Sequence, residues 1–213
     1  MLDGLTIKKC TNGLKIVKKT PKGWFGTQIS GLQMPLRENL HRIDFADELE
    51  GREIIESFRG ANNWLSNFYP CRIRYKNRPY ASTEHAYQAQ KSTNPLWEEA
   101  IRLALTPAMA KKKGDSVPLR PDWELIKDEI MLDVLRLKFK DPQLEKQLAE
   151  TYTTYLIEGV VWHDNYWGVC LLEGCAKCEN KKGQNKLGKL LMKVRKEILL
   201  EQLKEAVGLA KAQ

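Results

Sequence analysis

The chain has few cysteines and no long hydrophobic run. Its 213 residues include five cysteines, an odd and low number that favours a reducing cytoplasm over a disulfide framework. No stretch approaches the roughly 18 apolar residues that a transmembrane helix needs, so we expect no membrane partner. The opening stretch MLDGLTIKKC also lacks the apolar core of a secretory signal. Together these absences predict a cytoplasmic protein.

Several nucleotide-binding and hydrolase motifs are also missing. The sequence contains no G-x-x-x-x-G-K-[ST] loop and no dinucleotide-binding glycine fingerprint. It has no nucleophile elbow, no internal repeat and no low-complexity tract. These absences argue against a nucleotide-hydrolysing motor and against a serine hydrolase.

The composition is that of a globular protein with a basic surface. Hydrophobic residues make up 42 % of the chain and charged residues 29 %. The net charge of +8 favours partners that carry phosphate, although a basic surface that only meets solvent explains it equally well. The length suits one domain, or one domain with an extension.

Residues 1–52 differ from the rest and predict an N-terminal extension to a domain of residues 53–213. In LTIKKCTNGLKIVKK, the pair Asn12-Gly13 lies between two runs that favour strands, which is typical of a β-hairpin. We expect this hairpin to pack on the main domain.

Residues 53–80 favour strands, and residues from 82 onward favour helices. We expect EIIESF to pair with CRIRY, and Lys76-Asn77 marks a turn. Helical patterns follow in STEHAYQAQK, NPLWEEAIRLAL, TPAMAKKKG, PDWELIKDEIMLDVLRLKF, DPQLEKQLAE and NKLGKLLMKVRKEILLEQLKEAV. The sequence therefore predicts a mainly α fold with a small β element near the start.

The segment STEHAYQAQK is the first candidate for chemistry. Ser82 or Thr83 can cap a helix, and a helix that starts there brings Glu84, Gln88 and Lys91 onto one face. Tyr87 can then form a wall of the site. The competing explanation is an ordinary helix, because first-turn glutamates complement the helix dipole.

The segment NNWLSNFYP combines aromatic and amide side chains. Trp64, Ser66, Asn67 and Phe68 together suit a flat, polar ligand such as a nucleobase. Core aromatics beside turn-forming amides explain the composition as well.

Two charged residues lie in other unusual segments. In PLRPDWE, Arg120 can form a bidentate contact with phosphate, or it is a surface arginine before a helix that Asp122 caps. In WHDNYWG, Asp164 lies between two tryptophans and ahead of Gly168, where an Asp-Asn turn is the alternative.

The segment CLLEGCAKCEN contains three cysteines, Cys170, Cys175 and Cys178. Structural zinc usually needs four ligands, often from two close pairs, and this segment has one C-x-x-C pair. The nearby histidine is His163. We therefore expect free thiols in a loop, and no metal ligands.

Seven motifs follow one another along the chain: WLSNFYP, STEHAYQAQK, TPAMAKKKG, PLRPDWELIKDEIM, LKF, YWG and NKLGKLLMKVR. Their order resembles that of the NADAR family, the YbiA-like N-glycosidases. The resemblance covers residues 53–199. It implies a mostly helical orthogonal bundle with a small β element, and cleavage of C–N glycosidic bonds to ribose. It extends the candidate residues to Trp64, Asn67, Glu84, His85, Tyr87, Gln88, Lys91, Trp123, Trp167 and Gly168.

The resemblance implies that Lys91 acts through a Schiff base, and we expect Glu84 to act as the acid and base. The family substrates that it implies are ADP-ribosylated guanine in DNA or RNA and small ribosyl-phosphate intermediates of riboflavin synthesis. We favour removal of ADP-ribose from guanine, with the riboflavin intermediates or a non-catalytic binding module as alternatives. No metal or organic cofactor is required.

The chain departs from the family after YWG. The segment VCLLEGCAKCENKKGQ is longer than the usual glycine-rich loop, and it carries cysteines and basic residues. Lys181 and Lys182 suit a polynucleotide substrate.

Overall fold

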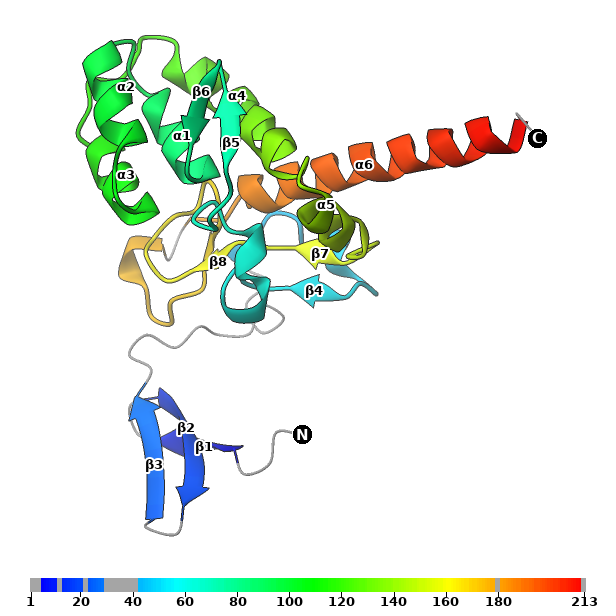
Figure 1. Cartoon of the computed structure of the whole chain (residues 1–213). Helices are drawn as coiled ribbons and strands as arrows, with labels where there is room; N and C mark the ends of the chain where they lie inside the picture. Colours follow the sequence, from blue (N-terminus) through cyan, green and yellow to red (C-terminus); the bar gives the residue numbers. More distant parts are fainter. Residues whose placement is uncertain (1–4, 11–12, 21–22, 29–41, 179–180, 212–213) are drawn as a thin grey trace.

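The computed structural model describes the backbone of residues 5–10, 13–20, 23–28, 42–178 and 181–211, and the side chains of residues 42–178 and 181–207. Its described part is mainly helical (Figure 1). The α-helices are α1 (Thr83–Ala89), α2 (Pro95–Arg102), α3 (Pro107–Gly114), α4 (Trp123–Lys138), α5 (Pro142–Ala149) and α6 (Lys186–Lys211). Three 3-10 helices are η3 (Ala46–Leu49), η4 (Gly60–Leu65) and η5 (Ala176–Cys178).

Helix α1 is the central element of the helical part. Ser82 caps it, because its hydroxyl accepts a hydrogen bond from the backbone N–H of His85 at 3.3 Å. All of its residues are buried, and it contacts α2, α3 and α4. The predicted helix start is confirmed, but α1 ends at Ala89, so Lys91 lies just beyond the helix. A short helix enclosed on three sides holds its polar side chains in fixed positions.

Helices α4 and α6 form the other long packing contact. Helix α4 packs against the main core through Trp123, Ile130 and Val134, and α6 adds Leu187 and Leu191. Asp122 is not a side-chain cap of α4, because its carboxylate pairs with a neighbouring arginine. The C-terminal part of α6 extends past the other helices (Figure 1).

The strands of residues 42–178 form three separate pairs. β5 (Ile73–Tyr75) and β6 (Arg78–Tyr80) are antiparallel and joined at Lys76-Asn77. Both turn residues have positive φ, 46° and 64°, as a type I′ hairpin turn requires. The predicted turn is therefore confirmed.

The predicted pairing of EIIESF with CRIRY is wrong. Within EIIESF, β4 (Ile54–Ile55) instead pairs in parallel with β7 (Tyr155–Leu156), about 100 residues away. β8 (Gly159–Val160) pairs in parallel with β9 (Val169–Cys170). Parallel partners come from distant or looped segments, so local sequence patterns do not reveal them.

Near the N-terminus, three strands form an antiparallel sheet: β1 (Leu5–Cys10), β2 (Gly13–Thr20) and β3 (Gly23–Gln28). The predicted hairpin strands are present as β1 and β2, and β3 adds a third strand beside β2. Asn12 and the predicted packing of the extension lie outside the described residues. That packing stays a prediction.

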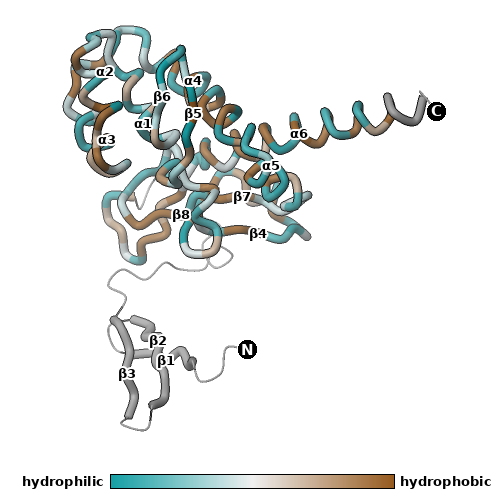
Figure 2. Tube along the Cα trace, in the orientation of Figure 1, coloured by the Kyte–Doolittle hydropathy of each residue, from teal (hydrophilic) through white to brown (hydrophobic). Residues whose placement is uncertain are grey.

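The end of the predicted extension belongs to a core cluster of the body. Ile43, Phe45 and Leu49 are buried with Tyr155 and Ile157, and the Phe45 and Tyr155 rings stack at 5.5 Å. The hydropathy colours show β4, β7 and β8 as mostly hydrophobic stretches of this region (Figure 2). In the described part of the chain, no helix has the length and apolar character that crossing a membrane requires.

Candidate active site

A cavity of about 900 Å³ opens beside α1, and many of the predicted site residues line it. Glu84, Tyr87 and Gln88 of α1 line it, together with Lys91. The other predicted residues in its lining are Ser66, Asn67, Phe68, Trp123, Asp164 and Trp167. Six segments of the chain, from η4 to α6, therefore supply one cavity whose volume suits a small molecule or a nucleotide.

The carboxyl group of Glu84 is buried at the cavity wall. Gln88 Nε2 donates a hydrogen bond to Glu84 Oε1 at 2.8 Å, one helical turn away. Burial raises the pKa of Glu84, against the opposing effects of this hydrogen bond and of the Lys111 and Lys91 ammonium groups. A carboxyl with a raised pKa keeps its proton to a higher pH than a free glutamate does, which suits a proton donor.

Gly114 of α3 leaves the space that Gln88 needs for its hydrogen bond to Glu84. A Cβ atom at Gly114 would lie 2.1 Å from Gln88 Oε1 and 2.9 Å from Gln88 Cβ. Because α3 approaches α1 so closely here, only glycine leaves Gln88 free to reach Glu84.

Lys91 reaches the cavity from the turn that follows α1. Its ammonium forms an ion pair with Asp115, with 3.0 Å between Nζ and Oδ1. Its carbonyl oxygen accepts a hydrogen bond from the backbone N–H of Arg120 at 2.8 Å, which anchors this turn. The turn and the ion pair together hold the Lys91 ammonium at the cavity.

Aromatic rings form one wall of the cavity. Tyr87 lies 5.1 Å from the Trp123 ring centroid and 5.5 Å from the Trp167 centroid, the latter edge to face. Tyr166 meets Trp167 edge to face at 5.1 Å. Burial raises the pKa of Tyr87, so its hydroxyl stays protonated. Such a wall suits a flat ring.

The segment after η4 forms the facing side. The Asn67 amide is buried, and it donates to Met131 Sδ at 3.3 Å and accepts from Thr83 Oγ1 at 3.2 Å. Phe68 is exposed, and its backbone N–H donates to Ser66 Oγ at 3.1 Å. The asparagine is thus already bonded, whereas Phe68 is free to contact a ligand.

Asp164 lines the cavity as the centre of a turn. Its Oδ1 accepts hydrogen bonds from the backbone N–H groups of Tyr166 at 3.0 Å and Trp167 at 2.9 Å. This is the Asp-Asn turn that the sequence allows, and it orients the Trp167 ring toward Tyr87.

Two predicted binding residues lie outside the cavity lining because other contacts hold them. Trp64 is partly buried and packs edge to face on Phe139, with 6.3 Å between centroids. The Arg120 guanidinium binds the Asp122 carboxylate with two hydrogen bonds, of 2.6 and 3.0 Å. A phosphate contact from Arg120 therefore requires that this pair separates.

His85 and Gly168 also lie outside the lining. The His85 ring is buried between Ser82 Oγ at 2.7 Å and the Ala104 carbonyl at 3.1 Å, and burial lowers its pKa. A Cβ at Gly168 would lie 2.3 Å from the Glu158 carbonyl oxygen. Both residues hold elements together, which is the simpler explanation for their place in the motifs.

The structure adds a cavity carboxyl that sequence reasoning missed, Glu158. Its Oε2 is out of contact with solvent and has no hydrogen-bond partner among the described residues. Burial raises its pKa to about 7, while Arg59 opposes the rise. The one available signal was an acidic residue within the apolar run YLIEGVV.

Basic residues also line the cavity. They are Arg59, Lys111 and Lys127, in addition to Lys91. Lys127 and the Tyr166 ring are in cation–π contact, with 3.8 Å from Nζ to the ring centroid. Together these cations make the cavity attractive to an anionic ligand.

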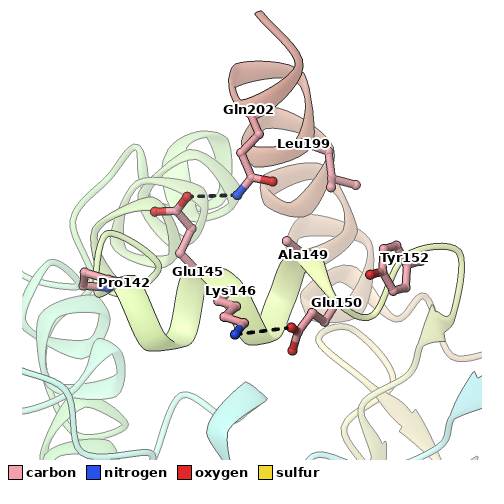
Figure 3. A pocket seen from close by; sticks show the side chains of 8 residues that line it. All are labelled: Pro142, Glu145, Lys146, Ala149, Glu150, Tyr152, Leu199 and Gln202. Atoms are coloured by element: carbon pink, nitrogen blue, oxygen red, sulfur yellow. Dashed lines mark hydrogen bonds and ion pairs between the residues drawn. The ribbon is translucent and has the colours of Figure 1, made fainter. Parts of the chain in front are cut away.

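A smaller cavity of about 310 Å³ lies between α5 and α6 (Figure 3). Its lining includes the Lys146–Glu150 ion pair at 3.8 Å and a hydrogen bond from Gln202 to Glu145 at 3.3 Å. These groups are already paired on the surface, and no buried acid is among them. The α1 cavity is therefore the better candidate.

The helical domain that holds this buried acid, amine and aromatic wall is similar to known proteins in structure and in sequence. The NMR structure of the Escherichia coli protein YbiA matches with a TM-score of 0.61 and 31 % identity, over 80 % of this chain and 96 % of that chain. The E. coli sequence, named N-glycosidase YbiA, is 34 % identical over 140 residues, which are 64 % of this chain and 82 % of the relative.

Two further relatives carry related names. N-glycosidase Npun_R5314 of Nostoc punctiforme is 37 % identical over 140 residues, covering 63 % of this chain and 84 % of the relative. Riboflavin biosynthesis protein VVA0006 of Vibrio vulnificus is 34 % identical over 140 residues, covering 64 % of this chain and 36 % of the relative. The NADAR domain family model matches residues 56–199. The chain therefore belongs to the NADAR family.

Proposed function

We propose that this protein removes ADP-ribose from guanine bases of nucleic acid by hydrolysing the ribosyl C–N bond. As a member of a family whose relatives are named N-glycosidases, the chain is a hydrolase acting on N-glycosyl bonds. The observation that carries the proposal is that Glu84 and Lys91 line the same cavity.

The proposed reaction uses both residues. Ring opening of the ribose gives an imine at C1′, and Lys91 Nζ adds to that carbon. The base nitrogen takes a proton from Glu84 and leaves, so that Lys91 holds the sugar as a Schiff base. Water then adds to C1′, with Glu84 accepting its proton, and hydrolysis releases the sugar and restores Lys91.

The Lys91–Asp115 ion pair sets a condition on this chemistry. An ammonium is not a nucleophile, so one proton must leave Lys91 before it attacks C1′. Glu158, whose carboxyl has a pKa of about 7, is a second group in the cavity that exchanges protons near neutral pH.

The choice of substrate rests on size and charge. The cavity of about 900 Å³ is at the large end for ligand sites, and its basic residues suit a diphosphate. The walls of Tyr87, Trp123 and Trp167 suit a base. An ADP-ribosylated guanine has the large size, the diphosphate and the base that these cavity features suit.

Two alternatives remain. The name of the Vibrio vulnificus relative favours a small ribosyl-phosphate intermediate of riboflavin synthesis as the substrate. A non-catalytic binding module has no need of an acid and an amine in one cavity. To distinguish these functions, purified protein should be incubated with ADP-ribosylated guanine in DNA or RNA, and separately with ribosylaminopyrimidine phosphates. The products should be identified by mass spectrometry. Release of ADP-ribose supports the proposal, whereas binding without any product supports the module.

The covalent step is tested by borohydride trapping. Reduction during turnover should attach the sugar to the wild-type chain, and Lys91→Ala should lose both the adduct and turnover. Lys112→Ala is the matched control, since Lys112 is exposed on α3 and outside the cavity lining. Normal turnover by Lys91→Ala would rule out the Schiff base. Full activity of folded Glu84→Gln would rule out the proton role.

A further inference from the structure

Four potential metal ligands from different segments converge next to the α1 cavity. They are His163, which follows β8, Cys170 of β9, Cys175, which precedes η5, and Cys178, the last residue of η5. Their ligand atoms all lie within 4.8 Å of one another. The three cysteines are free of disulfides, as expected, and the chain folds His163 back onto their sulfurs.

We propose that this cluster is a structural zinc site of the Cys₃His type. A tetrahedral site with Zn–S bonds of about 2.3 Å and Zn–N bonds of about 2.0–2.1 Å has ligand-to-ligand distances of about 3.5–3.8 Å. His163 Nδ1 lies 2.9 Å from Cys175 Sγ and 3.8 Å from Cys178 Sγ. Side-chain shifts of less than about 1 Å bring these distances to the zinc values.

The backbone around Cys175 and Cys178 is already shaped for metal binding. The Cys178 N–H donates to the Cys175 carbonyl at 2.9 Å, and η5 turns the two sulfurs of the C-x-x-C pair to the same side. Asn165 Oδ1 accepts from the Cys170 N–H at 3.0 Å, which fixes the third cysteine at the start of the segment. Three ligands are thus positioned by hydrogen bonds of the fold.

Burial and charge also fit a metal centre. All three cysteines are buried, yet they form a cluster of their own with Leu172, separate from the two larger cores. So small an apolar group stabilises residues 172–178 only weakly. Zinc with three thiolates and one imidazole carries a net charge of −1, and exposed Lys177, Lys181 and Lys182 surround the cluster in sequence.

The number of ligands favours a zinc site over a disulfide. A disulfide would use two of the three sulfurs and leave the third thiol and the imidazole unexplained. Four protein ligands close the tetrahedron, so this metal has no open position and takes no part in bond cleavage. Its role is to join the loop after β8 to the segment after β9.

This link reaches the candidate active site. Trp162 and Asp164, on either side of His163, line the α1 cavity. Zinc bound at His163 therefore fixes one wall of that cavity. Through the zinc, the cysteine-bearing segment after YWG holds this wall in place.

The test is metal analysis of the full chain, purified with reduced thiols and without chelators. We expect one zinc per chain by mass spectrometry of the metal. After zinc removal, added Co²⁺ should produce the visible absorption bands of tetrahedral thiolate coordination. A reduced chain that binds neither zinc nor Co²⁺ would overturn the proposal.

Variants separate this site from adventitious binding. Cys175→Ser and Cys178→Ser should each weaken zinc affinity at least tenfold in competition with a chromophoric chelator, and Cys71→Ser, a half-buried cysteine elsewhere, should not. His163→Ala covers the case in which a cysteine variant fails to fold, because the His163 side chain is exposed. Unchanged zinc affinity in His163→Ala would contradict the assignment of the fourth ligand. These readouts do not depend on glycosidase activity.

Discussion

Glu158 makes a measurable prediction about stability and pH. Burial raises the pKa of its carboxyl from 4.5 to about 7 in the folded chain. At about 1.36 kcal/mol per unit, the difference corresponds to about 3 kcal/mol of unfolding free energy, an upper figure because part of the side chain faces the cavity. Glu158→Gln removes the titration and keeps the shape of the side chain.

The sign follows from the proton balance. Between pH 4.5 and 7 the folded state binds more protons at Glu158 than the unfolded state does. The stabilising contribution of Glu158 is therefore complete below pH 4.5 and is lost as the pH rises through about 7. His85 acts in the opposite direction, because burial lowers its pKa: its contribution to stability is complete above about pH 6.5 and is lost as the pH falls below that value.

The measurement is urea unfolding of the wild type and of Glu158→Gln between pH 5 and 8. Subtracting the two curves removes His85 and every other shared group. We expect the stability of the wild type relative to Glu158→Gln to fall by about 2 kcal/mol over this range. Glu129→Gln, an exposed change on α4, is the control and should run parallel to the wild type. Parallel curves for Glu158→Gln would refute the inferred burial of a carboxyl that is protonated near neutral pH.

Three further predictions follow from the same contacts. Asp115→Asn removes the 3.0 Å ion pair of Lys91, and it should raise borohydride trapping at neutral pH about 1.4- to 5-fold, since such pairs are worth about 0.2–1 kcal/mol; an unchanged yield in a quantified adduct assay counts against this view. His85→Gln should reduce the loss of stability below pH 6.5, where the buried imidazole must take up a proton, and urea unfolding from pH 7 to 5 measures the slope. Gly168→Ala should lower the unfolding free energy by about 1–3 kcal/mol, because the added methyl meets the Glu158 carbonyl at 2.3 Å. A thermally unaltered Gly168→Ala protein would show that β8 and β9 can separate there.

Local signals in the sequence were sufficient for the elements themselves. The Ser82 cap, the Lys76-Asn77 turn and the period of α4 all depend on neighbours within about four residues. The parallel pairing of β4 with β7 depends on residues about 100 positions apart, and two residues per strand leave no pattern to read. The predicted pairing of EIIESF with CRIRY failed for that reason.

The candidate site divides in the same way. Glu84 and Gln88 lie one turn apart on one short helix, so their common face could be predicted from spacing, whereas Lys91, predicted on the same face, lies beyond the end of α1. His85, on the same helix, turned out to be enclosed by Ser82 and the Ala104 carbonyl, because α1 is covered on more sides than a surface helix.

By itself the sequence determined the helical class, the helix that bears Glu84, and the order of motifs that resembles the NADAR family, because each is encoded by residues close together in the chain. Only the tertiary structure decided that Lys91 faces Asp115, that Glu158 is buried at the same cavity, and that His163 meets the three cysteines. Those facts depend on long-range packing and desolvation, which bring together groups that are far apart in the sequence.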